Sequence, residues 1–202
     1  KEGAEMNYKI AMLGSDSCLE SFVKLLDNTS ITFIAENPKS EVFKLAGKLG
    51  IQCKYVPFEE LSAYFSANNF DLIVLTNYDR ILPQDVVTIG KFVNIHPSLL
   101  PAFKGPDAIM RSFMSGIKVS GVTVHWINSE VDGGKIIAQY PVLIGNSTHF
   151  DEFKTEIIKI ENMLYPIVVQ KILKDEVFDF TDLVGSFSNS CSNNCAGCKN
   201  CN

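Results

Sequence analysis

Short apolar segments that alternate with amphipathic ones are the feature that most limits how this chain can fold. The clearest is 71–75, where Asp71 precedes a continuous Leu-Ile-Val-Leu run, as expected of a parallel strand covered on both faces. A similar run at 92–95 leads directly into a polar motif. After the first run, at 8–13, apolar side chains recur at helical spacing. The alternation predicts strands followed by helices, and therefore a mostly parallel sheet.

The pattern assigns most of the chain to elements. We expect parallel strands at 8–13, 31–35, 53–56, 71–75 and 92–95, and helices that begin near Leu19 and span 42–49 and 58–69. Further along we expect a short helix at 108–114, a hairpin of strands at 119–126 and 135–143, and a long helix at 150–173 that Pro166 kinks. The predicted fold class is a single α/β domain over residues 7–184, with a mostly parallel twisted sheet, an antiparallel margin and helices on both faces.

Composition and charge narrow the function. The 202 residues are 46% hydrophobic and 20% charged, which is typical of a globular domain. A formal net charge of -5 argues against nucleic acid or an anionic membrane surface as a partner. No apolar run approaches the roughly 20 residues that span a membrane, and the first residues lack the order of a secretory signal. We expect a cytoplasmic monomer or homodimer in which the Cys18 and Cys53 thiols are reduced.

The segment 94–101, with the sequence NIHPSLLP, carries the strongest chemical signal together with the downstream Asp132-Gly133-Gly134. Asn94 and His96 stand two residues apart at the end of a predicted strand, so their side chains share one side of it. Taken singly, His-Pro and Asp-Gly are more often structural. Together, an amide, an imidazole and a carboxylate suit a tetrahedral intermediate. Asn94 and a protonated His96 would stabilise the oxyanion, and Asp132 would set the histidine charge and help relay a proton.

The run 92–143, which contains NIHPSLLPAFKG, GVTVHW and VDGGKIIAQYPV, resembles the folate-dependent formyltransferases, and most closely those that formylate glycinamide ribonucleotide. The likeness extends from about Lys9 to Leu173. It implies a Rossmann-like domain and transfer of a formyl group from the cosubstrate 10-formyltetrahydrofolate to a primary amine. By motif position, the catalytic residues would be Asn94, His96 and Asp132.

The resemblance also implies which residues contact the two substrates. The folate-contacting segments of the family match Arg80, Ile81 and Leu82, and also Ser129, Glu130, Val131, Asp132 and Gly133. The segments that contact the amine substrate match Gly14, Ser15, Ser17, Pro97 and Glu161. For Arg80 a solvated loop charge stays open as the alternative, and for Glu161 a charged position on a helix.

The amine acceptor is less constrained than the donor. Related enzymes that act on methionyl-tRNA or sugar nucleotides carry a further C-terminal domain, so the expected acceptor is glycinamide ribonucleotide in purine synthesis. Two departures from the family pattern concern this side, because Asp16 stands in the phosphate-cradling loop and residues 76–79 read Thr-Asn-Tyr-Asp. Asp16 either repels a phosphate dianion or turns away to cap the helix. A sugar-nucleotide acceptor, and a non-catalytic folate-binding or metal-sensing module, stay open.

The last segment, 185–202, is expected to be a cysteine-rich tail. Its Cys-x3-Cys-x2-Cys-x2-Cys spacing, among Ser, Asn, Gly and Lys, suits one tetrahedral zinc ion or one iron–sulfur cluster. The candidate ligands are Cys191, Cys195, Cys198 and Cys201. A disulfide or redox role, and a tail without order, stay open as alternatives.

Two body residues complete the expectations. His125 lies in the alternating strand 119–126 and is expected in the core or at an interface. Cys18 is expected to be a small apolar side chain at a helix start, a location that also favours a lowered thiol pKa.

Overall fold

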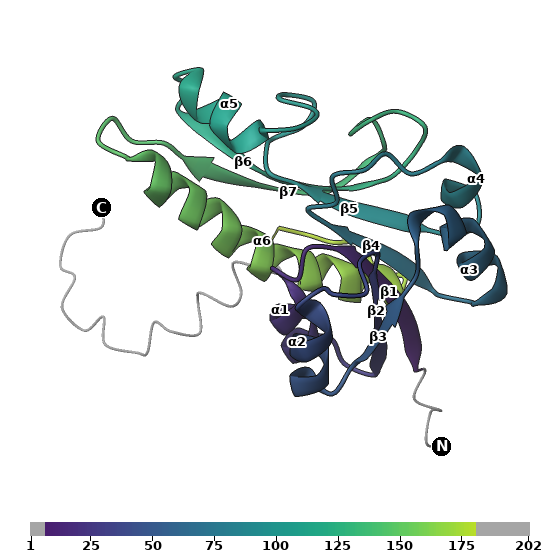
Figure 1. Cartoon of the computed structure of the whole chain (residues 1–202). Helices are drawn as coiled ribbons and strands as arrows, with labels where there is room; N and C mark the ends of the chain where they lie inside the picture. Colours follow the sequence, from purple (N-terminus) through teal and green to yellow (C-terminus); the bar gives the residue numbers. More distant parts are fainter. Residues whose placement is uncertain (1–6, 181–202) are drawn as a thin grey trace.

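A seven-stranded sheet forms the centre of the protein, whose computed structural model describes residues 7–180 (Figure 1). The strand order is β3-β2-β1-β4-β5-β6-β7. The first five strands are parallel, whereas β6 and β7 are antiparallel to their neighbours. The strands are β1 (Tyr8–Gly14), β2 (Thr29–Ala35), β3 (Gln52–Tyr55), β4 (Leu72–Thr76), β5 (Phe92–His96), β6 (Val119–Trp126) and β7 (Ile136–Leu143). The predicted fold class, including the antiparallel margin, is confirmed.

Helices cover both faces of the sheet, as the continuous apolar strands require. The helices are α1 (Leu19–Leu25), α2 (Val42–Leu49), α3 (Leu61–Ala67), α4 (Gln84–Val87), α5 (Ala108–Met114) and α6 (Phe150–Leu173), with a 3-10 turn at Phe58–Glu60. Alternate side chains of β1 divide between two apolar clusters: Ile10 and Met12 pack with α1, α2, α5 and α6, whereas Ala11 and Leu13 pack with α3 and α4. The core therefore has two layers, one on each face of the sheet.

Two helical details differ from the expectation, and two agree with it. The helix expected at 58–69 is divided into the 3-10 turn and α3. The four-residue helix α4 was not predicted, since a single turn is too short to show helical periodicity. Helix α6 spans its expected range with Pro166 inside it, and α2 ends at Gly50 in the left-handed conformation, as expected of a glycine stop.

Helix α6 is attached to the strand ends that carry the polar motif. The fully buried Tyr165 donates hydrogen bonds from its hydroxyl to the carbonyls of Leu75 in β4 and Val93 in β5, both at 2.9 Å. Its ring also packs edge-on against Phe22 of α1, with the centroids 5.3 Å apart. The long helix is thereby positioned beneath the carboxyl ends of the central strands.

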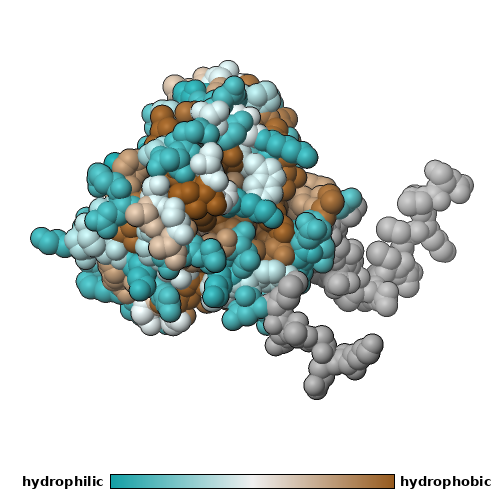
Figure 2. Space-filling view, turned by 90° about the vertical axis from the view of Figure 1, so that its right-hand side faces the viewer, coloured by the Kyte–Doolittle hydropathy of each residue, from teal (hydrophilic) through white to brown (hydrophobic). Residues whose placement is uncertain are grey.

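Within residues 7–180, no helix is long and apolar enough to cross a membrane. On the face seen in Figure 2, apolar groups are interrupted by hydrophilic ones.

Candidate active site

The end of β5 brings the predicted amide and imidazole together. Asn94 and His96 lie two residues apart in a regular strand, so both side chains project from the same face of the sheet. His96 is 5% exposed. Leu75 of β4 and His125 of β6 are the register partners of Asn94, and this places it between two neighbouring strands. The carboxyl end of β5 therefore presents polar groups where open α/β sheets gather their ligands.

Asp132 reaches the same place from the loop between β6 and β7. Its Oδ2 atom lies 3.4 Å from Nδ1 of His96 and accepts a 2.7 Å hydrogen bond from the Gly105 amide. The residue has a left-handed φ of 49°, a conformation that aspartate tolerates. Gly134 lets this loop return beside β6, because a Cβ atom there would lie 1.7 Å from the Trp126 carbonyl oxygen. The loop fixes the carboxylate against the histidine.

His125 completes a four-residue cluster and was underestimated by sequence reasoning. Its Nε2 lies 3.6 Å from Oδ1 of Asp132 and 3.4 Å from Nδ2 of Asn94. Its Nδ1–H donates to the Trp126 carbonyl at 2.9 Å, which leaves Nε2 to accept from the Asn94 amide. Burial lowers the pKa of His125, so the neutral form fits this arrangement. His125 lies in the core as expected, but it also belongs to the site.

His96 faces an oxygen atom on each side of its ring. Nε2–H donates to the Phe103 carbonyl at 3.0 Å, and Nδ1 points toward Asp132. Both ring nitrogens donate only when the ring is an imidazolium. Two oxygen atoms are thus placed where they could accept hydrogen bonds from the His96 ring. A substrate oxygen bound by Nε2–H would have to displace the Phe103 carbonyl.

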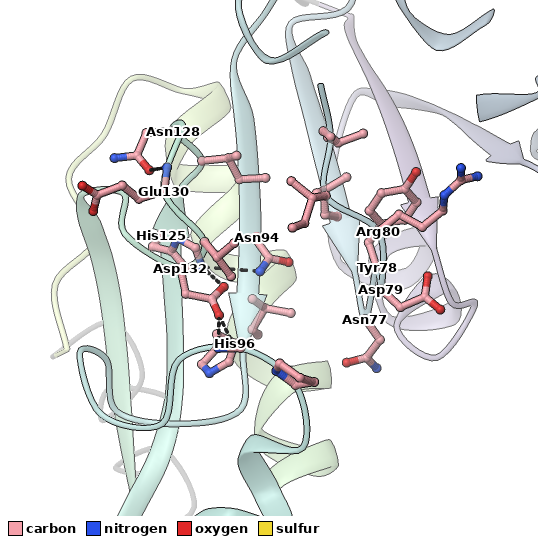
Figure 3. A pocket seen from close by; sticks show the side chains of 18 of the residues that line it. Asn77, Tyr78, Asp79, Arg80, Asn94, His96, His125, Asn128, Glu130 and Asp132 are labelled. Atoms are coloured by element: carbon pink, nitrogen blue, oxygen red, sulfur yellow. Dashed lines mark hydrogen bonds and ion pairs between the residues drawn. The ribbon is translucent and has the colours of Figure 1, made fainter. Parts of the chain in front are cut away.

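A pocket of about 820 Å³ opens beside the cluster. This volume lies within the range that holds a cofactor-sized ligand. Figure 3 shows Asn94, His96, His125 and Asp132 on one wall and the segment 77–80 facing them. Apolar side chains extend the lining away from the cluster; they include Leu75, Ile81, Leu82, Val87, Ile127 and Val131.

A second polar cluster holds the wall formed by 77–80. Glu36, just after β2, accepts a hydrogen bond from the Tyr78 hydroxyl and pairs with Nη1 of Arg80 at 2.7 Å. The guanidinium carbon of Arg80 also lies 3.4 Å from the centre of the Phe58 ring. Burial and the Glu36 hydrogen bond raise the pKa of Tyr78 above its usual range, so the phenol stays protonated. These contacts hold Arg80 at the pocket wall, but its side chain is 44% exposed, so both the ligand-contacting role and the solvated alternative stay open.

The first loop, at the end of β1, lies at the point where the sheet order reverses between β1 and β4. Gly14 has φ 111°, and a Cβ atom there would lie 2.1 Å from the Thr76 carbonyl oxygen, so only glycine fits the close approach of the two strands. The Ser15 and Ser17 hydroxyls lie 2.7 Å apart, and Nδ2 of Asn77 donates to them at 3.5 and 3.3 Å respectively. Asn77 lines the pocket and connects it to this loop.

Two expectations for this loop can be compared with the structure. Asp16 is exposed, and α1 has no side-chain hydrogen bond at its N-cap, so the capping alternative for Asp16 is not observed. The expectation of a lowered Cys18 thiol pKa is wrong. Cys18 is 2% exposed, and burial, followed by the nearby Glu161 carboxylate, raises the pKa of its thiol to about 12. A helix start cannot activate a thiol that is this poorly solvated.

Glu161 of α6 is a buried carboxyl behind the first loop. It is 3% exposed, and among the described residues its Oε1 atom has no hydrogen-bond partner. Burial raises the pKa of Glu161 to about 7. Its exposure is far below that of an ordinary charged position on a helix surface, so the solvated alternative does not hold.

The structure thus brings together most, but not all, of the residues that sequence reasoning selected. Among those lining the pocket are Asn94, His96, Asp132, Arg80, Ile81, Leu82, Ser129, Glu130, Val131 and Pro97. Those outside the lining are Gly133, Gly14, Ser15, Ser17 and Glu161. The lining also includes residues that were not selected, such as Gln84 and the loop 105–108. Their positions depend on loop conformation, for which the sequence carried no periodic signal.

The cysteines proposed as metal ligands, Cys191, Cys195, Cys198 and Cys201, lie outside the described residues. Within residues 7–180, no group of three or more His, Cys, Asp or Glu side chains could hold a metal ion.

The fold and the cluster define an enzyme site suited to acyl transfer, with amide and imidazole donors beside a partly buried carboxylate. Residues 10–169 match the sequence pattern of a family described as formyl transferase, and the chain belongs to this family. Members use 10-formyltetrahydrofolate, and the chain is a folate-dependent formyltransferase.

Individual relatives agree with this assignment. The chain is 32% identical over 177 residues to phosphoribosylglycinamide formyltransferase of Bacillus subtilis (strain 168), covering 79% of this chain and 91% of the relative. The solved structure of phosphoribosylglycinamide formyltransferase from Anaplasma phagocytophilum is 30% identical, with a TM-score of 0.77, and the match covers 84% of this chain and 88% of that one. The corresponding structure from Campylobacter jejuni subsp. jejuni is 32% identical, with a TM-score of 0.74 and coverage of 83% and 98%.

Proposed function

We propose that the protein transfers the formyl group of 10-formyltetrahydrofolate to the amino group of glycinamide ribonucleotide, in the cytoplasm, as a step of purine synthesis. The observation that carries the reaction type is the cluster of the buried His96 and His125 with the partly buried Asn94 and Asp132 beside a large pocket. The acceptor is supported by relatives at 30 to 32% identity that are named for it.

The donor fits the larger part of the pocket. Apolar side chains, among them Ile81, Leu82 and Ile127, would contact its flat ring system. The loop 129–133 would supply backbone groups next to Asp132. Arg80, held by Glu36, would meet the carboxylates of the donor's glutamate tail. The donor supplies an activated formyl group on nitrogen, and the protein residues bind it and stabilise charge.

The transfer would proceed through a tetrahedral intermediate. The acceptor amine attacks the formyl carbon, and the carbonyl oxygen becomes an oxyanion stabilised by the Asn94 amide and the protonated His96. One amide hydrogen of Asn94 is directed to His125, which leaves the second for the oxyanion. Asp132 would relay the proton lost by the amine to the departing folate nitrogen as the carbon–nitrogen bond to the donor breaks.

The acceptor would approach from the first loop. Gly14, Ser15 and Ser17 would surround its phosphate, Pro97 would border the amine, and Glu161 would contact the remainder of the ribonucleotide. Asp16 opposes a phosphate at this loop, since it places an exposed negative charge there. Solvent screening limits this repulsion to a weakening of affinity.

An acceptor screen tests the proposal. Purified protein is mixed with 10-formyltetrahydrofolate and with glycinamide ribonucleotide, an amino-sugar nucleotide or methionyl-tRNA, and folate release is followed by absorbance. We expect turnover with glycinamide ribonucleotide. Turnover only with an amino-sugar nucleotide would overturn the acceptor, and folate binding without turnover on any amine would overturn the enzyme function.

For the remainder of the chain, we propose that residues 7–184 form the catalytic domain and that 185–202 form a metal-binding tail. The spacing of its four cysteines supports zinc or an iron–sulfur cluster. Metal analysis of anaerobically purified protein, compared with Cys195→Ser, checks this, and equal metal content in the two proteins would contradict it. A monomer or homodimer stays a prediction that size-exclusion chromatography with light scattering tests.

A further inference from the structure

Arg111 of α5 contacts the active-site loop from outside the pocket. Its Nη2 donates to three successive carbonyls, those of Phe103 at 2.8 Å, Gly105 at 3.3 Å, and Lys104 between them. Arg111 is exposed and is not among the residues that line the pocket. Nothing in the proposed reaction requires a cation at this position, so the contacts call for a separate explanation.

Two of the three residues that Arg111 holds contact the proposed catalytic side chains. The Phe103 carbonyl accepts the hydrogen bond from Nε2 of His96 at 3.0 Å. The Gly105 amide donates to Oδ2 of Asp132 at 2.7 Å. A single loop of three residues thus links the histidine, the carboxylate and the guanidinium.

The loop has no regular structure that would hold it in this shape. Phe103 and Gly105 both have left-handed φ values, 56° and 80° respectively, and for phenylalanine this conformation is unfavourable. An irregular segment needs external hydrogen bonds to persist in one conformation. A guanidinium, with its rigid array of N–H donors, can contact several neighbouring carbonyls at once.

We propose that Arg111 is a positioning residue for formyl transfer, which fixes loop 103–105 and through it the geometry of His96 and Asp132. The inference rests on the proposed reaction but not on the identity of the acceptor. When Nε2–H of His96 turns to the oxyanion, the Phe103 carbonyl loses that partner but keeps Arg111. His96 can therefore turn to the oxyanion without leaving the Phe103 carbonyl unpaired. An unpaired carbonyl would cost free energy and oppose this rotation.

Kinetics of Arg111→Ala and Arg111→Lys test the proposal. We expect kcat of Arg111→Ala to fall roughly 10- to 100-fold, as expected of a displaced catalytic group, with the donor KM changed less than about threefold. The kcat of Arg111→Lys should be intermediate, because an ammonium group cannot contact the carbonyls in the way that the planar guanidinium does. Millimolar guanidinium should restore part of the Arg111→Ala rate, whereas methylammonium should not. Lys118→Ala, which removes a cation shortly after the same helix, serves as the control.

A second measurement does not depend on turnover. Hydrogen exchange of the Gly105 amide, followed by NMR, should accelerate in Arg111→Ala, since the loop that aligns it with Asp132 is released. It should be unchanged in Lys118→Ala. Unaltered exchange together with unaltered kcat would overturn the proposal, as would a loss of activity that guanidinium fails to restore. If wild-type protein is inactive on every amine, the proposed function fails, while the exchange experiment still decides whether Arg111 holds the loop.

Discussion

The two ends of the active site are held in different ways. At the β5 end, the buried His96 and His125 and the partly buried Asp132 come from three different segments, and each side chain has a partner from another segment. At the β1 end, Ser15 and Ser17 bond to each other and to Asn77, and Asp16 is exposed.

This difference indicates which part of the site tolerates substitution. A buried cluster with mutual hydrogen bonds loses several interactions when one member changes, since each partner is left unpaired. Hydroxyls on an exposed loop exchange partners with water at little cost. We therefore expect substitutions in the β5 cluster to be costly, whereas the β1 loop, the proposed acceptor end, can be altered by single surface substitutions. Three predictions test this contrast, beginning with the largest effect.

Removing the imidazole should have the largest effect. His96→Ala is expected to lower kcat by about 10³-fold, because the oxyanion loses a charged donor. The measurement is steady-state formyl transfer at saturating substrates. His149→Ala is the matched control: this exposed histidine caps α6, so its loss should lower the melting temperature but leave kcat unchanged. Comparable kcat losses in both variants would contradict a special role for the β5 cluster.

Glu161, behind the β1 loop, should make stability depend on pH. The folded protein keeps the carboxyl proton up to about pH 7, whereas the unfolded chain releases it near 4.5, so its contribution to stability is greatest below 4.5 and is lost as pH rises through 7. The free energy of unfolding of Glu161→Gln, relative to that of wild type, should therefore rise by about 3 kcal/mol from pH 4.5 to pH 8. Urea unfolding at both pH values measures this. An equal difference in unfolding free energy between variant and wild type at the two pH values would contradict the prediction.

The smallest effect is expected at Asp16. Asp16→Asn removes an exposed negative charge from the loop and should lower the KM for glycinamide ribonucleotide about threefold to tenfold at low salt, with less effect at high salt. The control is Asp27→Asn, another exposed acid outside this loop, which should leave KM unchanged. A fall in kcat in Asp16→Asn would mean that the two ends of the site are not separable.

Much of the fold was predictable because its signals are local. The elements at 108–114, 119–126 and 150–173 match the observed bounds of α5, β6 and α6. Periodicity and turn residues determine such elements over a few positions. The division of 58–69 and the single turn of α4 were missed, since a segment of three or four residues is shorter than the period that identifies it.

The candidate site was predictable to a similar degree. The common direction of Asn94 and His96 follows from strand geometry, and the structure places Asp132 beside them. His125 was expected in the core or at an interface, with a ligand contact as the lesser alternative, because its position opposite Asn94 depends on the pairing register of β5 and β6. Cys18 is the small apolar side chain that was expected, but its thiol pKa was misjudged, since the side chain lies in a core cluster that includes α6, and burial together with the Glu161 carboxylate raises that pKa.

The sequence by itself determined the order of strands and helices, the polar end of β5 and the family of the chain. Only the tertiary structure decided that Asp132 meets both His96 and His125, that Arg111 holds the loop between them, and that Glu161 is buried behind Cys18. The physical reason is the distance along the chain over which each kind of signal acts. Alternation and helical spacing act between neighbours along the chain, whereas these contacts depend on strand register, packing between distant segments and, for Arg111, the irregular conformation of a loop.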